Sequence, residues 1–163
     1  MLSFIIYPHL NTVSNMQKNN KWDQCFLEIA QAASKLSKDP STQCGAVIID
    51  RNRRIISTGY NGLPRGVPDD DAVLNSREKK YKRVIHAEIN ALLFAHQDLS
   101  DCVIYVYPVP PCAQCTAAII QSGIREIVTI EAGGDFAARW NDDLIAAREM
   151  CADAGVAIRI LRQ

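Results

Sequence analysis

The second half of the chain alternates β-branched runs with helix-like runs, and this alternation limits the folds that the chain can adopt. Residues 102–107 (CVIYVY), 126–131 (EIVTIE) and 156–161 (VAIRIL) are typical of buried strands. Residues 112–123 and 141–155 lie between them, and each of these runs ends in glycine, which commonly terminates helices. Strands separated by helices pair in parallel through crossover connections. We therefore expect a sheet with parallel strands covered by helices.

The first half of the chain predicts a helix and a hairpin. Apolar residues recur at three- and four-residue spacing over residues 22–37, which is typical of an amphipathic helix. Two β-rich runs, residues 44–50 and 54–60, are separated by a short polar turn and predict a hairpin. Residues 86–97 again show helical spacing. The whole order predicts an α/β fold, a three-layer α/β/α domain with a five-stranded mixed sheet.

The composition is that of one globular domain. The chain has 163 residues, of which 48% are hydrophobic and 22% are charged. Residues 1–20 are expected to form a weakly structured N-terminal extension, followed by one folded domain over residues 21–163. The 18 basic residues balance the 18 acidic ones, whereas dedicated nucleic-acid binders usually have a basic excess. This balance argues against a nucleic acid polymer as partner.

The six cysteines would permit disulfides in a secreted protein. The opening residues lack the basic region and the cleavage pattern of a signal peptide, and their apolar run is too short to span a bilayer. We therefore expect a reducing, cytoplasmic location and no membrane contact. Four cysteines are expected to serve as small apolar residues: Cys25, Cys44, Cys102 and Cys151.

Three polar segments fall between the predicted elements. Residues 61–76 contain glycine, proline and three consecutive aspartates, so they predict a long loop, and such loops are often functional. Residues 77–83 (REKKYKR) are rich in charge and predict a solvated helix face. Residues 133–140 follow a strand end and have two interpretations, a surface loop or a cover over a substrate.

Two short motifs place metal-binding residue types at the starts of consecutive predicted helices. His86 opens one helix, and Cys112 and Cys115 lie in the first turn of the next. Helix N-termini donate free N–H groups and favour the thiolate that a soft metal needs. One histidine and two cysteines suit zinc. Because three protein ligands are evident, a fourth position stays open for water, which is typical of a catalytic site.

Glu88 lies two residues after His86 on the same predicted helix. This offset turns its side chain away from the direction in which His86 points. Glu88 is therefore expected to flank the metal and to accept a proton from the bound water, rather than to bind the metal itself.

Each of these residues has an ordinary interpretation when it stands alone. A C-x-x-C pair can be redox-active, a histidine at a helix start can be a cap, and a glutamate there can complement the helix dipole. Together, H-x-E followed by P-C-x-x-C matches the signature of zinc deaminases. A deaminase of polynucleotides, a non-catalytic zinc scaffold with a fourth protein ligand and a redox protein remain as alternatives.

The chain resembles the cytidine deaminase-like superfamily, and within it the deoxycytidylate (dCMP) deaminases, over about residues 22–161. Beyond the zinc motif, the resemblance rests on residues 37–48 (SKDPSTQCGAVI), 57–66 (STGYNGLPRG) and 119–128 (IIQSGIREIV) and on Asn90. The chain departs from the pattern at Pro110, where the family usually has an aromatic residue, and at Cys44, where valine is common. The first departure bears on base specificity, because that strand end borders the base pocket of the family.

The resemblance implies a zinc-dependent hydrolase that acts on the amidine C–N bond of a cytosine nucleotide. It would convert dCMP to dUMP with release of ammonia and so supply dUMP for thymidylate synthesis. Glu88 would carry one proton to N3 of cytosine and a second proton to the leaving amino group. Deamination of dCTP or of 5-substituted dCMP is the alternative within the same chemistry.

The resemblance also implies residues that hold the substrate. The backbone N–H of Ala87 would bind the pyrimidine O2, the Pro111 carbonyl would face the amino group, and Asn61 would hold the deoxyribose hydroxyl or the phosphate. Further candidates for the phosphate lie ahead of the first predicted strand: Lys38, Thr42 and Gln43.

Many dCMP deaminases of this type are hexamers that dCTP activates and dTTP inhibits, and the resemblance implies a homo-oligomer with such effectors here. The candidate effector residues lie in one loop, in which Arg65 can bind phosphate directly. Asp69 and Asp70 are acidic, so a triphosphate beside them would need Mg²⁺.

Overall fold

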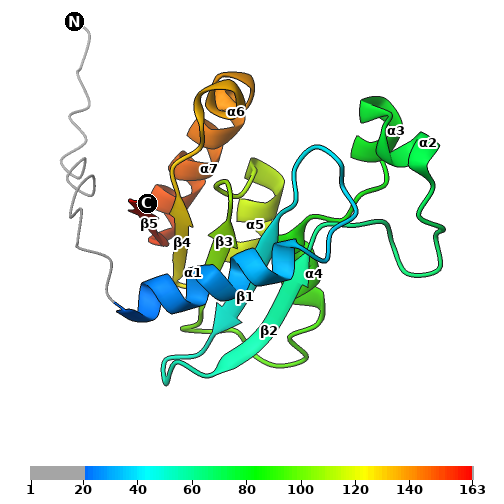
Figure 1. Cartoon of the computed structure of the whole chain (residues 1–163). Helices are drawn as coiled ribbons and strands as arrows, with labels where there is room; N and C mark the ends of the chain where they lie inside the picture. The colour runs from blue at the N-terminus through cyan, green and yellow to red at the C-terminus, as the bar shows by residue number, and fades with distance from the viewer. Residues whose placement is uncertain (1–20, 163) are drawn as a thin grey trace, which may run out of the picture.

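A five-stranded sheet forms the centre of the computed structural model, which describes residues 21–162 (Figure 1). The strand order is β2-β1-β3-β4-β5. The strands are β1 (Gly45–Ile49), β2 (Ile55–Tyr60), β3 (Val103–Tyr107), β4 (Glu126–Ile130) and β5 (Ala157–Leu161). The three inner strands are buried at almost every residue, as their continuous β-branched runs predict.

Four of the five strands end at the same edge of the sheet. β1 pairs antiparallel with both β2 and β3, and its first residue, Gly45, lies opposite Tyr60 and Tyr107. β3, β4 and β5 are parallel to one another. The helices that follow β2, β3 and β4 therefore all begin at the edge where those strands end.

Helices cover both faces of the sheet and make the predicted three layers. α1 (Lys21–Ser34) lies on one face, in front of the strands in Figure 1. α4 (Ala87–Leu93), α5 (Ala113–Gln121) and α7 (Asn141–Ala154) cover the other face. The predicted fold class, a three-layer α/β/α domain with a mixed sheet, is confirmed.

Three short helices occupy the polar segments between the main elements. α2 (Asp71–Leu74) lies within the predicted loop 61–76, and α6 (Gly134–Arg139) lies within residues 133–140, which are therefore not a simple loop. α3 (Arg77–Tyr81) is the expected charged helix. The prediction that this helix is a solvated face is wrong at Lys80, whose side chain is 6% exposed. The predicted extension over residues 1–20 lies outside the described residues.

Two glycines allow helices to approach the sheet closely. A Cβ atom on Gly45 would lie 1.9 Å from the carbonyl oxygen of Ala30 in α1. On the opposite face, a Cβ atom on Gly59 would lie 2.2 Å from the carbonyl oxygen of Ala87 in α4. Asn90 of α4 donates from Nδ2 to the Tyr60 carbonyl at 2.7 Å. The first turn of α4 is thus packed directly against the end of β2.

A charged cluster joins the first helix to the last strand. The guanidinium of Arg159 binds Asp23 in a bidentate manner, with N–O distances of 2.7 and 2.8 Å. The Tyr105 hydroxyl donates to the same carboxylate at 2.8 Å, and burial together with this bond raises the pKa of Tyr105. The cluster fixes α1 across the sheet. Within residues 21–162, the helices are too short or too polar to cross a membrane.

The Gly59→Ala variant is expected to be less stable than the wild-type protein by about 1–3 kcal/mol, because the added methyl group forces α4 away from β2. Denaturant unfolding followed by circular dichroism measures the change. Gly133→Ala is the matched control, since its Cβ meets nothing within 4 Å, and its stability should change by less than ~1 kcal/mol. Equal stabilities of the two variants would contradict the close approach at Gly59.

Candidate active site

His86 stands immediately before α4 and is its N-terminal cap. The chain reaches it from β2 through a long excursion, residues 61–85, that carries α2 and α3. Two backbone hydrogen bonds close this excursion at its base, from Gly62 N–H to the Ile85 carbonyl at 3.0 Å and from Ile85 N–H to the Gly62 carbonyl at 2.8 Å. These bonds fix the backbone just before His86 at a position beside the end of β2.

Cys112 and Cys115 lie at the start of α5, as predicted. Cys112 is the N-cap, and its Sγ accepts the Cys115 N–H at 3.4 Å. A sulfur in this position receives a free N–H group at the positive end of the helix. The C-x-x-C spacing thus turns both sulfurs toward the same point in front of the helix.

The three predicted metal ligands converge. His86 Nδ1 lies 3.5 Å from Cys112 Sγ and 3.3 Å from Cys115 Sγ, and the three ligand atoms all lie within 4.8 Å of one another. Ligand atoms that bind one zinc ion in a tetrahedral arrangement at their usual distances lie roughly 3.5 Å apart. Within residues 21–162, no fourth His, Cys, Asp or Glu joins this group. The residues fit a zinc ion with one open coordination position, and a zinc scaffold with four protein ligands is disfavoured.

The electrostatics of Cys112 and Cys115 favour a thiolate at one of the two cysteines. Hydrogen bonds from Cys115 and His86 lower the pKa of Cys112 to about 4. The pKa of Cys115 is raised, first by its hydrogen bond to Cys112 and then by burial. The hydrogen bond to Cys112 also raises the pKa of His86. Because a metal binds deprotonated ligands, zinc uptake at this site should displace protons from Cys115 and His86.

Glu88 lies in the first turn of α4, beside the ligand group, and is 5% exposed. Burial raises the pKa of its carboxyl group, and the positive charge of His86 opposes this shift. A carboxyl group with a raised pKa is suited to gaining and losing a proton near neutral pH. The structure thus places the predicted proton carrier within the site, apart from the three converging ligands.

Asp143 is a residue of this site that the sequence reasoning missed. It lies in the first turn of α7, and its Oδ2 accepts the Ala113 N–H of α5 at 2.7 Å. The bond fixes the helix start that carries Cys112, and the negative charge contributes to the raised pKa of His86. The sequence offered a weak signal, since acidic residues are common in first turns for reasons of the helix dipole alone.

Comparison with known proteins agrees with this geometry. The sequence profile of the family described as "Cytidine and deoxycytidylate deaminase zinc-binding region" matches residues 20–131, which include all three ligands and Glu88. The chain belongs to this family. The match supports zinc as the metal of the His86–Cys112–Cys115 group and disfavours a redox role for the cysteine pair.

Curated relatives of this deaminase family cover most of the chain. An uncharacterized deaminase in the luxG 3' region of Aliivibrio fischeri is 45% identical over 139 residues, which are 85% of this chain and 92% of the relative. The deoxycytidylate deaminase of Homo sapiens is 34% identical over 145 residues, 85% of this chain and 79% of the relative. The solved structure of the dCMP deaminase from cyanophage S-TIM5 shares the fold, with a TM-score of 0.69 at 18% identity over 88% of this chain and 99% of that one.

The predicted substrate residues at the helix starts lie beside the ligands. Ala87 is fully buried as the first residue of α4, and Pro111 is buried immediately before Cys112. Asn61 is also buried, but its side chain bonds within the protein: Oδ1 accepts the Cys44 N–H at 2.7 Å, and Nδ2 donates to the Thr42 carbonyl at 3.0 Å. Contact of Asn61 with a nucleotide stays a prediction.

The phosphate and effector candidates are brought together on one side of the molecule. A pocket of about 280 Å³ is lined by residues from both predicted groups: Lys38, Asn61, Arg65 and Asp69. Lys38 Nζ lies 2.6 Å from Asp69 Oδ2, and Arg65 lies over the ring of Phe94. The pocket thus joins two sets of residues that the sequence assigned to different ligands.

Three other candidates have partners near this pocket. Asp70 caps α2 by accepting the Ala72 N–H at 2.8 Å. Gln43 donates from Nε2 to the Ser37 carbonyl at 2.7 Å, and the Thr42 N–H donates to Asp39 Oδ1 at 3.2 Å. Asp70 therefore has a local structural role, whereas the binding roles of Thr42 and Gln43 remain predictions.

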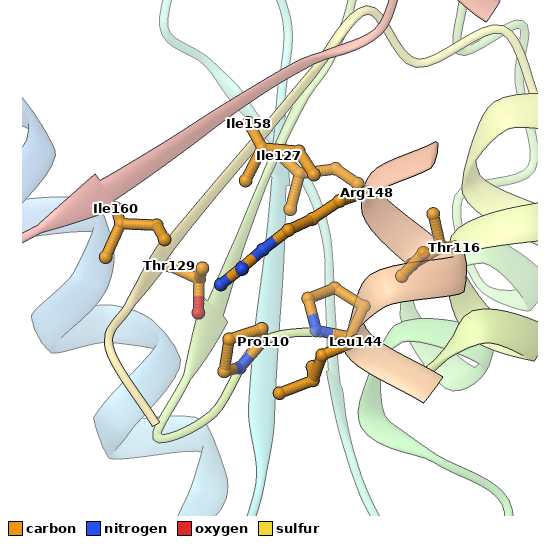
Figure 2. Close-up of a pocket in the computed structure, with 10 residues that line it drawn as sticks. Pro110, Thr116, Ile127, Thr129, Leu144, Arg148, Ile158 and Ile160 are labelled. Carbon is orange, nitrogen blue, oxygen red and sulfur yellow. The ribbon is translucent and has the colours of Figure 1, made fainter. Parts of the chain in front are cut away.

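The two prolines before Cys112 face a small cavity under α7. Figure 2 shows Arg148 of α7 reaching across this cavity toward Thr129 of β4 and Pro110. The cavity volume is about 20 Å³, which is room for about one water molecule. The cavity is too small for a nucleotide. Pro110, where the chain departs from the family pattern, therefore lines a small packing cavity under α7.

The segment after β4 meets α3 at the end of the sheet. The rings of Trp140, which precedes α7, and Tyr81 of α3 have centroids 6.1 Å apart. The contact joins residues 133–140 to the excursion that leads into His86. It agrees with the interpretation of residues 133–140 as a cover, which stays a prediction.

The remaining four cysteines are free thiols, and three of them are buried or partly buried, as expected for small apolar residues. Cys102 and Cys151 are buried in the core, and Cys44 is partly buried. Burial and the neighbouring Glu88 raise the pKa of Cys44 to about 12, so it stays a neutral thiol. Cys25 is exposed, so the expectation that it packs as an apolar residue is wrong.

The Cys112→Ala variant is expected to lose zinc, because only His86 and Cys115 remain to hold the ion. Elemental analysis of the purified protein measures zinc per chain. Cys25→Ala is the control, since Cys25 is exposed and outside the group, and it should keep the wild-type zinc content. Full zinc occupancy in Cys112→Ala would refute the ligand assignment.

The Asp143→Ala variant is expected to release zinc to a chelator about tenfold faster than wild type, since the start of α5 loses its hydrogen-bond acceptor. Asp142→Ala removes the adjacent, exposed carboxylate of the same helical turn and should release zinc at the wild-type rate. Equal release rates for both variants would show that Asp143 does not hold the metal site.

Proposed function

We propose that this chain catalyses the hydrolytic deamination of dCMP to dUMP with release of ammonia. The observation that carries the proposal is the convergence of His86, Cys112 and Cys115 beside the buried carboxyl group of Glu88, in a chain of the zinc deaminase family. The choice of dCMP follows from relatives that are named deoxycytidylate deaminases and are 34–38% identical. The product dUMP is the precursor for thymidylate synthesis.

Zinc held by the three ligands would lower the pKa of a bound water toward neutrality. Glu88 is the proton carrier in the proposed reaction. It accepts a proton from the water and delivers it to N3 of cytosine, which makes C4 electrophilic. The hydroxyl group that remains of the water forms a bond to C4. Glu88 then takes the proton of this hydroxyl group and transfers it to the amino group as the C–N bond breaks, so that water and dCMP give dUMP and ammonia. The buried position and raised pKa of Glu88 suit both transfers.

The base is proposed to lie between the starts of α4 and α5. The Ala87 N–H is one of the N-terminal amides that have no partner within a helix, so it can donate to the pyrimidine O2. The Pro111 carbonyl would accept from the amino group of cytosine at C4. Both residues are adjacent in sequence to a metal ligand, which supports contact with a base that reacts at the metal.

The sugar and the phosphate are proposed to bind near residues 38–43 and Asn61. Lys38 is exposed and carries the positive charge that a phosphate needs, and it is paired with Asp69. Thr42 and Gln43 follow in the same loop and offer a hydroxyl group and an amide. Asn61 supports this contact by holding the loop through Thr42 and Cys44.

Regulation by dCTP and dTTP in a hexamer is proposed at the pocket that contains Arg65 and Asp69. Its volume of about 280 Å³, one arginine and one lysine suit the phosphates of a nucleotide. An acidic lining would call for Mg²⁺ beside a triphosphate. Asp70 is proposed to act there only through the helix that it caps.

We further propose that residues 21–163 form one catalytic domain and that it works in the cytoplasm. The support for this compartment is chemical: all six cysteines are free thiols, and the metal ligands need a reducing environment. An action on polynucleotides is disfavoured by the zero net charge and by an aromatic content of 7%.

The Glu88→Gln variant is expected to retain zinc and to lose about 10²–10⁴-fold in kcat, since an amide cannot carry the proton. Ammonia release and zinc content are measured on the same preparation. Glu28→Gln changes an exposed glutamate of α1 and should keep full activity. Activity of Glu88→Gln near the wild-type value would exclude Glu88 as the proton carrier.

A panel of possible substrates tests the proposed function itself. Ammonia release is compared for cytidine, CMP, dCMP, dCTP, 5-substituted dCMP and a single-stranded oligodeoxynucleotide, each with and without dCTP or dTTP as effector. The highest kcat/KM is expected for dCMP. A higher value for dCTP, a modified nucleotide or the oligonucleotide would replace dCMP as the substrate.

A further inference from the structure

A buried ion pair lies outside the metal ligands and has no part in the proposed chemistry. Lys80 Nζ of α3 lies 2.8 Å from Asp39 Oδ1, and their side chains are 6% and 7% exposed. Lysine and aspartate are rarely buried to this extent. Replacing a buried pair by apolar residues is often neutral or stabilising, so stability alone is a weak reason for its presence.

Asp39 organises the loop that leads from α1 to β1. Its Oδ1 accepts the Ser41 N–H at 2.8 Å and the Thr42 N–H at 3.2 Å, in addition to the ammonium group of Lys80. Lys80 also donates to Ser41 Oγ at 3.0 Å. The pair thus fixes the backbone at the two residues that precede Gln43.

The same carboxylate reaches the end of β2. Asp39 Oδ2 accepts from Asn61 Nδ2 at 3.4 Å, and Asn61 in turn binds the Thr42 carbonyl and the Cys44 N–H. These bonds join residues 39–44 and Asn61 into one network. All the polar groups proposed to hold the sugar and phosphate, except Lys38, belong to this network or flank it.

Lys80 connects this network to the segment that enters the metal site. Its own carbonyl accepts the N–H groups of Arg83 and Val84 at 2.9 and 2.8 Å. Ile85 follows and is bonded to Gly62, and His86 comes next. Lys80 therefore anchors the excursion 61–85 to the loop at residues 39–44.

We propose that Asp39 and Lys80 are positioning residues for substrate binding: their buried ion pair holds residues 41–44 and Asn61 in the geometry that binds the nucleotide. The proposal rests on the proposed function for the identity of the substrate. It assigns no chemical step to the pair. Loss of the pair should weaken nucleotide binding and leave proton transfer by Glu88 unchanged.

The test uses the double variant Asp39→Leu/Lys80→Met in the full chain. The single variant Lys80→Met leaves a buried carboxylate without its cation and is expected to be strongly destabilised, whereas the double variant leaves no buried charge. Lys79→Met, an exposed lysine one residue away, is the matched control. For the double variant, we expect about a tenfold higher KM for dCMP, equivalent to ~1.4 kcal/mol, with kcat within about twofold of wild type and an unchanged zinc content.

A second readout does not depend on the substrate. Amide hydrogen exchange at residues 41–44 should be faster in the double variant, while exchange in β4 should match wild type and Lys79→Met. Unchanged exchange at residues 41–44 overturns the proposal, and so does faster exchange with an unchanged KM. If the wild-type protein released no ammonia from dCMP, the proposed function would fail, and the exchange result would still decide whether the pair positions the loop.

Discussion

The common direction of β2, β3, β4 and β5 is the constraint on which the rest of the structure depends. Because these strands end at one edge of the sheet, α4, α5 and α7 all begin there. This arrangement brings together the ligands His86 and Cys112 and the supporting Asp143, although they come from the starts of three separate helices. The reversed β1 starts at the same edge, so the loop at residues 39–44 reaches it as well. This is the edge at which parallel sheets commonly bind their ligands.

Three buried or partly buried carboxylates near this edge have different environments and therefore different roles. Within residues 21–162, no lysine or arginine is bonded to Glu88, and burial raises its pKa, which suits a proton carrier. Asp39 is paired with Lys80 and accepts backbone N–H groups, which suits a fixed anion that orders a loop. Asp143 accepts an N–H at the start of α5 and supports the cysteine ligands. The role of each carboxylate thus follows from its burial and from the groups to which it is bonded.

Local sequence patterns predicted the elements well and predicted the surroundings of charged residues poorly. Zinc ligands could be identified because H-x-E and P-C-x-x-C each place their residues on a single helix start, within one turn. The buried ion pair of Lys80 could not be predicted, since residues 77–83 have the composition of a solvated helix and its partner Asp39 is 41 residues away. The charge of Asp70 suggests an effector contact, which stays a prediction, whereas the cap that it forms on a four-residue helix could not be predicted from its charge. Neither the ion pair of Lys80 nor the helix cap of Asp70 leaves a periodic signal in the sequence.

The sequence by itself determined the layered α/β/α fold and predicted the zinc ligands and the proton carrier, because periodicity and short motifs are properties of neighbouring residues. It also marked residues 61–76 and 133–140 as segments of interest. The tertiary structure alone decided that Asp143 holds the helix of Cys112, that Asn61 bonds to the loop of Thr42, and that Lys38 meets Asp69 in one pocket. These contacts join segments far apart in the chain, and their partners are selected by strand direction and helix packing, which no local pattern records.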